Sequence, residues 1–307
     1  MPMRTLICSI ILTTLLVTVP AFSAANSEQM PPEYQKVLDA LGKKGDYKDH
    51  VLKINIPRND LSVSVDGVAT PTGFGFGGWL ALAKGTGGND VMMGDLVLLE
   101  KEVNPVMSAL LDNGLEVTAL HNHFFFDQPR IFYMHVHGHG KAEELARMAK
   151  PAVDLIGHVE EQSANKSGNG SALSGQLDTA KIAQIVGHQG EQSGPVYKIT
   201  VGRDDLHIRD MGAVVNARMG LNTWAAFIGS DQDAAVAGDV AMLAHEVTPV
   251  LKALRSHGLD VVAVHHHMTT TQPMIFFLHY WGHGPADKLA TGFKAALDEL
   301  GANHRAH

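Results

Sequence analysis

The sequence predicts an α+β protein built from two similar repeats, each a mainly antiparallel sheet with flanking helices and a histidine-rich β-hairpin. Three observations lead to this fold class. The chain repeats itself at a spacing of 144 to 145 residues, and apolar positions within each repeat follow strand-like and helix-like periods in turn. In addition, ten of the 18 histidines fall in two equivalent windows, 121–139 and 265–283. An internal duplication therefore organises the predicted fold.

The first 25 residues have the layout of a secretory signal peptide. Arg4 precedes an apolar run over residues 7–19, and small residues follow up to Ala25. The run is short for a bilayer span, and no later apolar segment is long enough to cross a membrane. Cys8 is the single cysteine and lies in this segment, so cleavage would leave neither a disulfide nor a thiolate ligand. We expect an exported protein, periplasmic or secreted, without membrane association after cleavage.

Charge and composition exclude some classes of partner. The chain has 24 Lys and Arg against 32 Asp and Glu, for a formal net charge of −8. This balance provides no basic surface for nucleic acid. Charged residues make up only 18% of the chain, which is typical of a compact protein with a substantial core.

The duplication is clearest around the histidines. "LEVTALHNHFFFDQPRIFYMHVHGHG" (115–140) aligns with "LDVVAVHHHMTTTQPMIFFLHYWGHG" (259–284), and 13 of the 26 positions are identical. Between the repeats lies a segment rich in Ser, Gly and Asn, which is typical of a flexible linker. The predicted boundaries are 1–25 for the signal peptide, 31–157 for repeat one, 158–177 for the linker and 178–303 for repeat two.

The elements of one repeat can be predicted in order. A short helix ends at Gly42, the strands "HVLKINI" and "LSVSVDGV" follow, and a Gly-rich stretch leads to strands around Trp79 and at "DLVLLE". The next helix is expected to start at the N-cap Asn104, with Pro105 in its first position, and to end before Gly114. The histidine-rich hairpin and a closing amphipathic helix complete the repeat. The second repeat has the same order, and helices are expected on one face of each sheet.

The spacing of the histidines predicts a metal site. Side chains two apart on a strand share a face, so His121 and His123 point one way together. A tight turn about Gln128 would place His121 opposite His135, with Cβ atoms roughly 5 Å apart. Trp281 takes the place of one histidine in the second repeat. The candidate metal ligands are His121, His123, His135, His137, His139, His265, His267, His279 and His283.

Without thiolates, the ligands must be nitrogen and oxygen. Imidazole suits zinc, copper, iron and nickel, and we expect zinc first, with iron or copper as alternatives. Glu102 and Glu246 occupy equivalent positions and are candidate carboxylate ligands or catalytic bases. The alternative interpretation is a negative charge that stabilises a helix N-terminus. Arg58 and Arg203, each followed two residues later by an aspartate, predict structural ion pairs or turns, with anion binding as the alternative.

Three functions stay open at this point. The first is an exported protein that binds a transition metal through the paired hairpins. The second is a metal-dependent hydrolase or oxidoreductase, in which one open metal position activates a substrate. The third is a metal-free module for a small-molecule ligand, with the histidines in a hydrogen-bond network. The sequence has no G-x-S-x-G motif and no cysteine nucleophile, so it does not determine whether the protein is an enzyme.

The doubled "H-x-H…QP…IFxxHxxGHG" layout behind a signal peptide resembles the LppY/LpqO family of secreted bacterial proteins. The resemblance covers most of the mature chain and depends on the histidine segments. It implies duplication and export, and it implies no particular reaction. The chain differs from the lipoprotein members because no cysteine follows the apolar run. That difference predicts a form without a lipid anchor.

Overall fold

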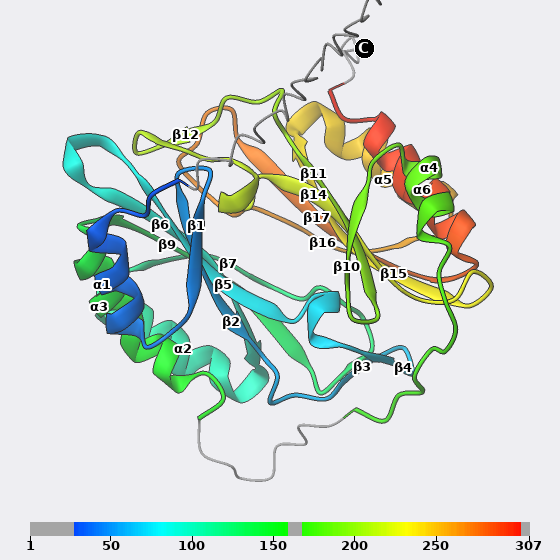
Figure 1. The fold of residues 1–307 in the computed structure, drawn as a ribbon, viewed down its shortest axis with the longest axis horizontal. Helices are drawn as coiled ribbons and strands as arrows, with labels where there is room; N and C mark the ends of the chain where they lie inside the picture. The colour runs from blue at the N-terminus through cyan, green and yellow to red at the C-terminus, as the bar shows by residue number, and fades with distance from the viewer. Residues whose placement is uncertain (1–27, 159–167, 302–307) are drawn as a thin grey trace, which may run out of the picture.

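The structure is a computed structural model that describes residues 28–158 and 168–301 (Figure 1). The predicted signal peptide, residues 1–25, and residues 159–167 of the predicted linker lie outside this part of the chain. Within the described residues, no helix combines the length and the apolar character needed to cross a bilayer.

Repeat one forms a six-stranded antiparallel sheet in the order β1-β2-β5-β6-β9-β7, together with a three-stranded sheet in the order β4-β3-β8. Its helices are α1 (Pro32–Leu41), α2 (Glu100–Asp112) and α3 (Ala142–Leu155). Its strands are β1 (Gly45–Lys48), β2 (Val51–Pro57), β3 (Val63–Val65), β4 (Val68–Thr70), β5 (Gly77–Lys84), β6 (Asp90–Leu99), β7 (Glu116–His121), β8 (Asp127–Gln128) and β9 (Ile131–Gly140). Two short 3₁₀ helices, η1 (Thr72–Phe74) and η2 (Thr86–Gly88), lie in the loops.

Repeat two has the same architecture, with the sheet order β10-β11-β14-β15-β17-β16. Its helices are α4 (Thr179–Val186), α5 (Ala244–Ser256) and α6 (Ala286–Asp298), with the 3₁₀ helix η3 (Ala217–Met219). Its strands are β10 (Gly190–Ser193), β11 (Val196–Gly202), β12 (Arg209–Asp210), β13 (Ala213–Val214), β14 (Asn222–Gly229), β15 (Ala234–Leu243), β16 (Asp260–His265) and β17 (Ile275–Gly284). The predicted α+β duplication is therefore confirmed.

The two sheets pack face to face, and the helices cover their outer faces (Figure 1). Each sheet has a core with its own helices, as where Leu52 and Leu145 are buried together. Two further clusters combine both repeats, and one of them contains Tyr133 and Trp281. Because strand side chains alternate, every second residue of β9 and β17 points into the space between the sheets. This alternation decides where the histidines lie.

Helix α2 begins earlier than its sequence signals predict. It starts at Glu100, so Pro105 lies inside the helix rather than in its first position. The reason is that the Glu102 carboxylate accepts a hydrogen bond from the Leu99 amide at 2.7 Å and caps the helix there. Gly114 has the left-handed φ of 82° that was predicted after the helix end.

The register of the histidine strands also differs from the prediction. In the β7–β9 pair, His121 lies opposite Tyr133, and His135 lies opposite Ala119. The cause is the connection over residues 122–130, which is not a tight turn. Part of it forms β8, which pairs with β3 instead. His121 and His135 are consequently diagonal neighbours, with ring centroids 5.1 Å apart.

The described half of the predicted linker is bound to repeat one. The Gly168 amide donates to Ser62 O at 2.7 Å, and the Ser171 amide donates to Gly67 O at 2.8 Å. Ser171 also forms a bridge with Val68 on β4. Residues 168–171 thus follow the small sheet of repeat one before the chain enters repeat two.

Candidate metal centre

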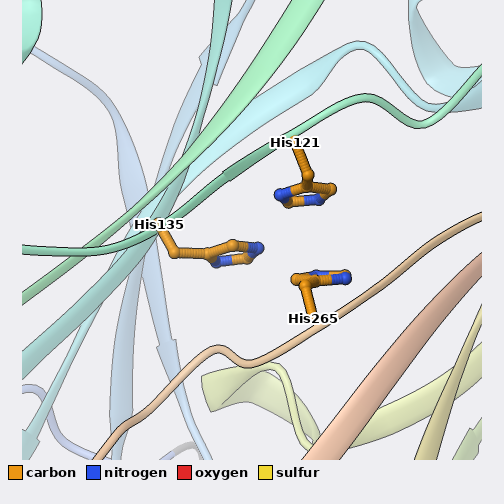
Figure 2. Close-up of side chains that lie close together, drawn as sticks. All are labelled: His121, His135 and His265. Carbon is orange, nitrogen blue, oxygen red and sulfur yellow. The ribbon is translucent and has the colours of Figure 1, made fainter.

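Six of the predicted histidines converge between the two sheets. Figure 2 shows three of them, His121, His135 and His265, which point toward one another from both repeats. The complete set is His121, His123, His135, His265, His267 and His279. The two histidine-rich segments therefore contribute to one shared centre rather than to two separate sites.

The six rings form two equivalent groups, one the counterpart of the other under the duplication. The first trio is His121, His123 and His279, and the second trio is His265, His267 and His135. The shortest ring separation is 3.5 Å in the first trio and 4.0 Å in the second. His121 and His265 stack on each other at 3.7 Å between the trios. These matching distances indicate a pseudo-two-fold relation between the repeats at this point.

The ring nitrogens are close enough to share an ion. One nitrogen from each member of the first trio lies within 4.8 Å of the other two, and the same holds for the group of His121, His135 and His265. Zinc binds imidazole nitrogen at about 2.0–2.1 Å, so tetrahedral ligands lie roughly 3–4 Å apart. Small side-chain movements would bring either group to that spacing.

Most of these nitrogens have no partner. Within the described residues, ten buried ring nitrogens of the six histidines make no hydrogen bond. The two that do are Nδ1 of His135, 3.2 Å from Gly94 O, and Nδ1 of His279, 3.3 Å from Gly238 O. Because a carbonyl oxygen accepts a hydrogen bond only from an N–H group, Nδ1 of both rings carries the proton. Nε2 of each neutral ring is then an unprotonated acceptor, which is the form in which histidine binds a metal. Each unpaired buried polar group costs about 1–3 kcal/mol.

The six histidines are neutral in this environment. Burial lowers the pKa of His135 to about 3. Burial, reinforced by neighbouring histidines, also lowers the pKa of the other five well below the ordinary value. Neutral imidazole is the form that ligates a metal, so a cation would not compete with protons here near neutral pH.

Two carboxylates lie beside the histidines, the half-buried Asp95 and the buried Asp239. Asp95 on β6 is opposite His135, and Asp239 on β15 is opposite His279. One oxygen of each makes no hydrogen bond, and Asp239 Oδ2 is 4.0 Å from Nε2 of His267. Burial raises the pKa of Asp95 to about 8 and raises that of Asp239 as well. The sequence interpretation missed both, although the repeated Gly-Asp pairs that begin "GDLVLLE" and "GDVAMLA" were a visible signal.

Three predicted ligands lie elsewhere. His137 is buried in a different contact, with Nε2 2.6 Å from Asp210 Oδ2 of the other repeat. Burial opposes its protonation, but the hydrogen bond and charge of Asp210 raise its pKa above the ordinary value. His139 and His283 are exposed near the ends of their strands, and His283 pairs with Asp233 at 2.9 Å.

The two candidate bases are occupied by structural contacts. Glu102 pairs with Arg58 at 2.6 Å and accepts hydrogen bonds from the Leu99 and Gly157 amides. Glu246 repeats this arrangement with Arg203 at 2.8 Å. Each arginine also forms the predicted ion pair with the aspartate two residues later, Asp60 at 2.9 Å and Asp205 at 2.8 Å. The pairs with Glu102 and Glu246 were not predicted, and each glutamate caps its helix.

A cavity of ≈560 Å³ reaches the histidine centre. Three of the six histidines and these two aspartates contribute to its wall, namely His123, His267, His279, Asp95 and Asp239. Lys53 and Lys198 lie further along the same wall, close to two tryptophans. A small molecule in this cavity would contact both the histidines and the lysines.

Comparisons with known proteins identify the family. No curated protein matches the sequence. Among solved structures, a trimeric bacterial microcompartment shell protein, PduB, has 12% identity over 82% of this chain and 90% of its own, with a TM-score of 0.20. EtuB from Clostridium kluyveri has 7% identity over 84% of this chain and 89% of its own, also with a TM-score of 0.20. These TM-scores support no conclusion on fold or function.

A family model described as Domain of Unknown Function (DUF1259) matches the chain twice, over residues 35–155 and 180–299. The two matches fall one on each repeat and together cover more than half of the sequence. The protein belongs to the DUF1259 family and contains two copies of its domain.

Proposed function

We propose that this protein binds a transition metal at the six-histidine centre, with zinc as the first expectation and iron or copper as alternatives. The observation that carries the proposal is the convergence of ten unpartnered, buried ring nitrogens from both repeats. A metal-free histidine network would satisfy these nitrogens with hydrogen-bond partners, since buried polar groups are rarely left unpaired. A cation would use the free acceptors directly.

The symmetry of the trios supports more than one arrangement of the metal. One ion could sit in the first trio, or each trio could hold an ion with His121 and His265 between them. Two ions about 3.5–4 Å apart are typical of centres that bind a bridging ligand. The stoichiometry of binding therefore distinguishes these arrangements.

An enzyme is the second candidate function, and the cavity favours it. Catalytic metals keep one coordination position open to water or substrate, whereas structural metals are closed by four protein ligands. Since the cavity reaches both trios, a bound ion would have such a position. Asp95 and Asp239 would then be the carboxylates nearest to the bound molecule, because Glu102 and Glu246 are held by arginines. Hydrolysis and redox chemistry both fit this arrangement, and the identity of the bound metal would determine which of them occurs.

The test is metal analysis of the mature protein, purified without a histidine tag, followed by calorimetric titration of the metal-free form with Zn²⁺. We expect near-stoichiometric metal and tight binding. His121→Ala/His265→Ala should weaken binding by at least ~100-fold, since even the loss of an outer partner of a ligand costs about 10–100-fold.

The matched control is His139→Ala/His283→Ala, which removes two histidines of the same repeated segments that are exposed. This control should bind Zn²⁺ as the wild type does. If wild-type protein carries no metal and binds neither Zn²⁺ nor Cu²⁺ on reconstitution, the proposal is wrong. If the control loses binding as fully as the first variant, the ligands have been assigned to the wrong histidines.

We also propose that the protein is exported and that its LppY/LpqO-like layout reflects that family relation. The support is the N-terminal pattern of residues 1–25 and the doubled histidine motif. Mass spectrometry of protein recovered from the periplasm or medium of an expressing bacterium should show a chain that starts just after Ala25. A full-length chain confined to the cytoplasm would contradict export.

A further inference from the structure

We infer that the cavity beside the histidine centre binds a small molecule carrying a carboxylate or phosphate group, which Lys53 and Lys198 hold. The inference names a ligand class for the site and extends the proposed metal-binding function. It depends on a separate set of residues, so the two can be tested independently.

The first observation is the pairing of the lysines across the duplication. Lys53 on β2 and Lys198 on β11 are equivalent residues, and both line the cavity. Nζ of Lys53 is 4.6 Å from the centre of the Trp79 ring, and Nζ of Lys198 is 4.0 Å from the centre of the Trp224 ring. The tryptophans are also equivalent and line the same cavity. Each repeat thus contributes one ammonium group supported by an aromatic face.

The second observation is that these ammonium groups form no direct ion pair, although Asp95 and Asp239 lie near enough to raise their pKa. Within the described residues, neither Lys53 nor Lys198 forms an ion pair or a side-chain hydrogen bond, whereas Lys84 pairs with both Glu33 and Asp90. Both lysines are only partly exposed. A partly buried ammonium group with three unused donors is costly, and a bound oxyanion would satisfy those donors.

The third observation is the accumulation of positive charge at this wall. Burial and the nearby charge of Arg218 lower the pKa of Lys53 to about 8. Burial and the charge of Lys53 lower the pKa of Lys198 to about 8. Arg218 also lines the cavity; its Nη2 pairs with Asp46, and its buried Nε has no partner. These three cationic groups line a cavity that also contains the carboxylates of Asp95 and Asp239, and their unused donors would bind an oxyanion.

The depth of the cavity relates the anion to the centre. The volume of ≈560 Å³ exceeds the need of a single inorganic ion and falls in the range of small-molecule pockets. His123, His267 and His279 line the same cavity. A molecule held by its oxyanion at the lysines would therefore place its remaining atoms against the histidines, where a metal-bound position would be open.

The probes are inorganic phosphate and succinate, which separate the phosphate and carboxylate forms of the ligand. Each is titrated into the mature protein in metal-free and Zn²⁺-loaded forms, with calorimetry and tryptophan fluorescence as readouts. Trp79 and Trp224 are two of the three tryptophans, so a bound anion should change the emission. We expect binding of at least one probe in the metal-free form.

Lys53→Met/Lys198→Met should weaken anion binding by about 10–100-fold, which corresponds to the loss of hydrogen bonds to charged groups. Lys53→Arg/Lys198→Arg keeps both charges and should retain binding. The matched control is Lys43→Met/Lys252→Met, which removes two exposed lysines elsewhere and should bind as the wild type does. Single Lys53→Met and Lys198→Met variants decide the question if the double variant fails to fold.

The outcomes separate the two proposals. Loss of anion binding with Zn²⁺ affinity unchanged supports the anion site. Binding of phosphate or succinate by protein that takes up no Zn²⁺ would support the anion site and contradict the metal-binding proposal. If neither probe binds in either form at millimolar concentrations, or if the methionine variants bind as the wild type does, the anion inference is wrong while the metal proposal stands.

Discussion

Acid should destabilise the metal-free protein, because six histidines are neutral in the folded state and become protonated when the chain unfolds. Burial lowers the pKa of His135 to about 3, and it lowers those of the other five as well. In the unfolded chain each histidine has a pKa of about 6.5. Below that pH the unfolded state binds more protons, so the free energy of unfolding falls as the pH falls.

The magnitude follows from these pKa values. Each pH unit below 6.5 costs about 1.4 kcal/mol per histidine, so at pH 5.0 the six together cost about 12 kcal/mol. Asp95, whose pKa is raised to about 8, and Asp239, whose pKa is also raised, act in the opposite direction. They bind protons in the folded state that the unfolded state releases, so Asp95 offsets about 3 kcal/mol between pH 7.5 and 5.0, and Asp239 acts in the same direction. The raised pKa of His137 adds to this offset.

The net loss is therefore less than about 9 kcal/mol, the histidine cost of about 12 less the Asp95 offset of about 3, and it is comparable to the total stability of a typical protein, about 5–15 kcal/mol. The assay is urea denaturation of protein treated with a chelator, at pH values from 7.5 to 5.0. His121→Asn/His265→Asn removes two of the six groups and should reduce the loss at pH 5.0 by about 4 kcal/mol relative to wild type.

His188→Asn/His207→Asn, at two exposed positions, is the control and should follow the wild type. Equal losses of stability in the wild type and in the His121/His265 variant would refute the argument from buried histidines. Added Zn²⁺ should restore stability near neutral pH, since a ligand that binds only the folded state stabilises it.

Three further changes test other parts of the structure by urea denaturation at neutral pH. Glu102→Gln should cost about 2–3 kcal/mol, because it removes one of the two carboxylates that pair with the buried Arg58 and leaves only Asp60. His137→Phe should also destabilise the protein by about 3 kcal/mol or more, since it leaves the Asp210 carboxylate buried without its cross-repeat partner. Gly94→Ala should cost about 1–3 kcal/mol, because a Cβ there would lie 2.7 Å from a buried valine methyl group and 2.9 Å from a backbone oxygen.

These changes also differ in their effect on metal. Glu102→Gln and His137→Phe should leave Zn²⁺ affinity unchanged, because neither residue belongs to the six-histidine centre. Gly94→Ala should weaken Zn²⁺ binding, since the Gly94 carbonyl orients the ring of His135. A loss of Zn²⁺ binding in His137→Phe would place this histidine among the ligands after all. Unchanged stability in Glu102→Gln would contradict the structural role of the ion pair.

Local signals explain what could be predicted of the fold. The two repeats, most of their helices and strands, and the left-handed Gly114 follow from periodicity and turn chemistry within a few residues. The sequence did not predict β1, and the single strand predicted over 61–68 is divided into β3 and β4. The start of α2 did not follow, because Asn104 and Pro105 form a good N-terminal signal that competes with the Glu102 cap. Helix propensity alone does not decide between these two N-terminal signals, because Glu102 is also held by the buried Arg58, a contact that only the tertiary structure provides.

The candidate site was predictable only in part, for the same reason. The duplication singled out four pairs of equivalent histidines. It did not show whether Glu102 or Asp95 lies at the site, because both residues recur in the second repeat. The structure distinguishes them, because Glu102 pairs with Arg58, whereas Asp95 lies opposite His135 and lines the cavity. Exposure likewise separates His139 from His135, although both lie on the same face of β9.

By itself the sequence determined the duplication, the α+β class and the residue types able to ligate a metal, because these depend on composition and short-range periodicity. Only the tertiary structure decided that the two histidine segments form one centre. That outcome requires the two sheets to pack face to face, which brings His121 against His265 across the 144 residues that separate them in the chain. The packing is set by the apolar residues shared between the repeats, and each of those contacts joins positions too distant in sequence for any local pattern to reveal.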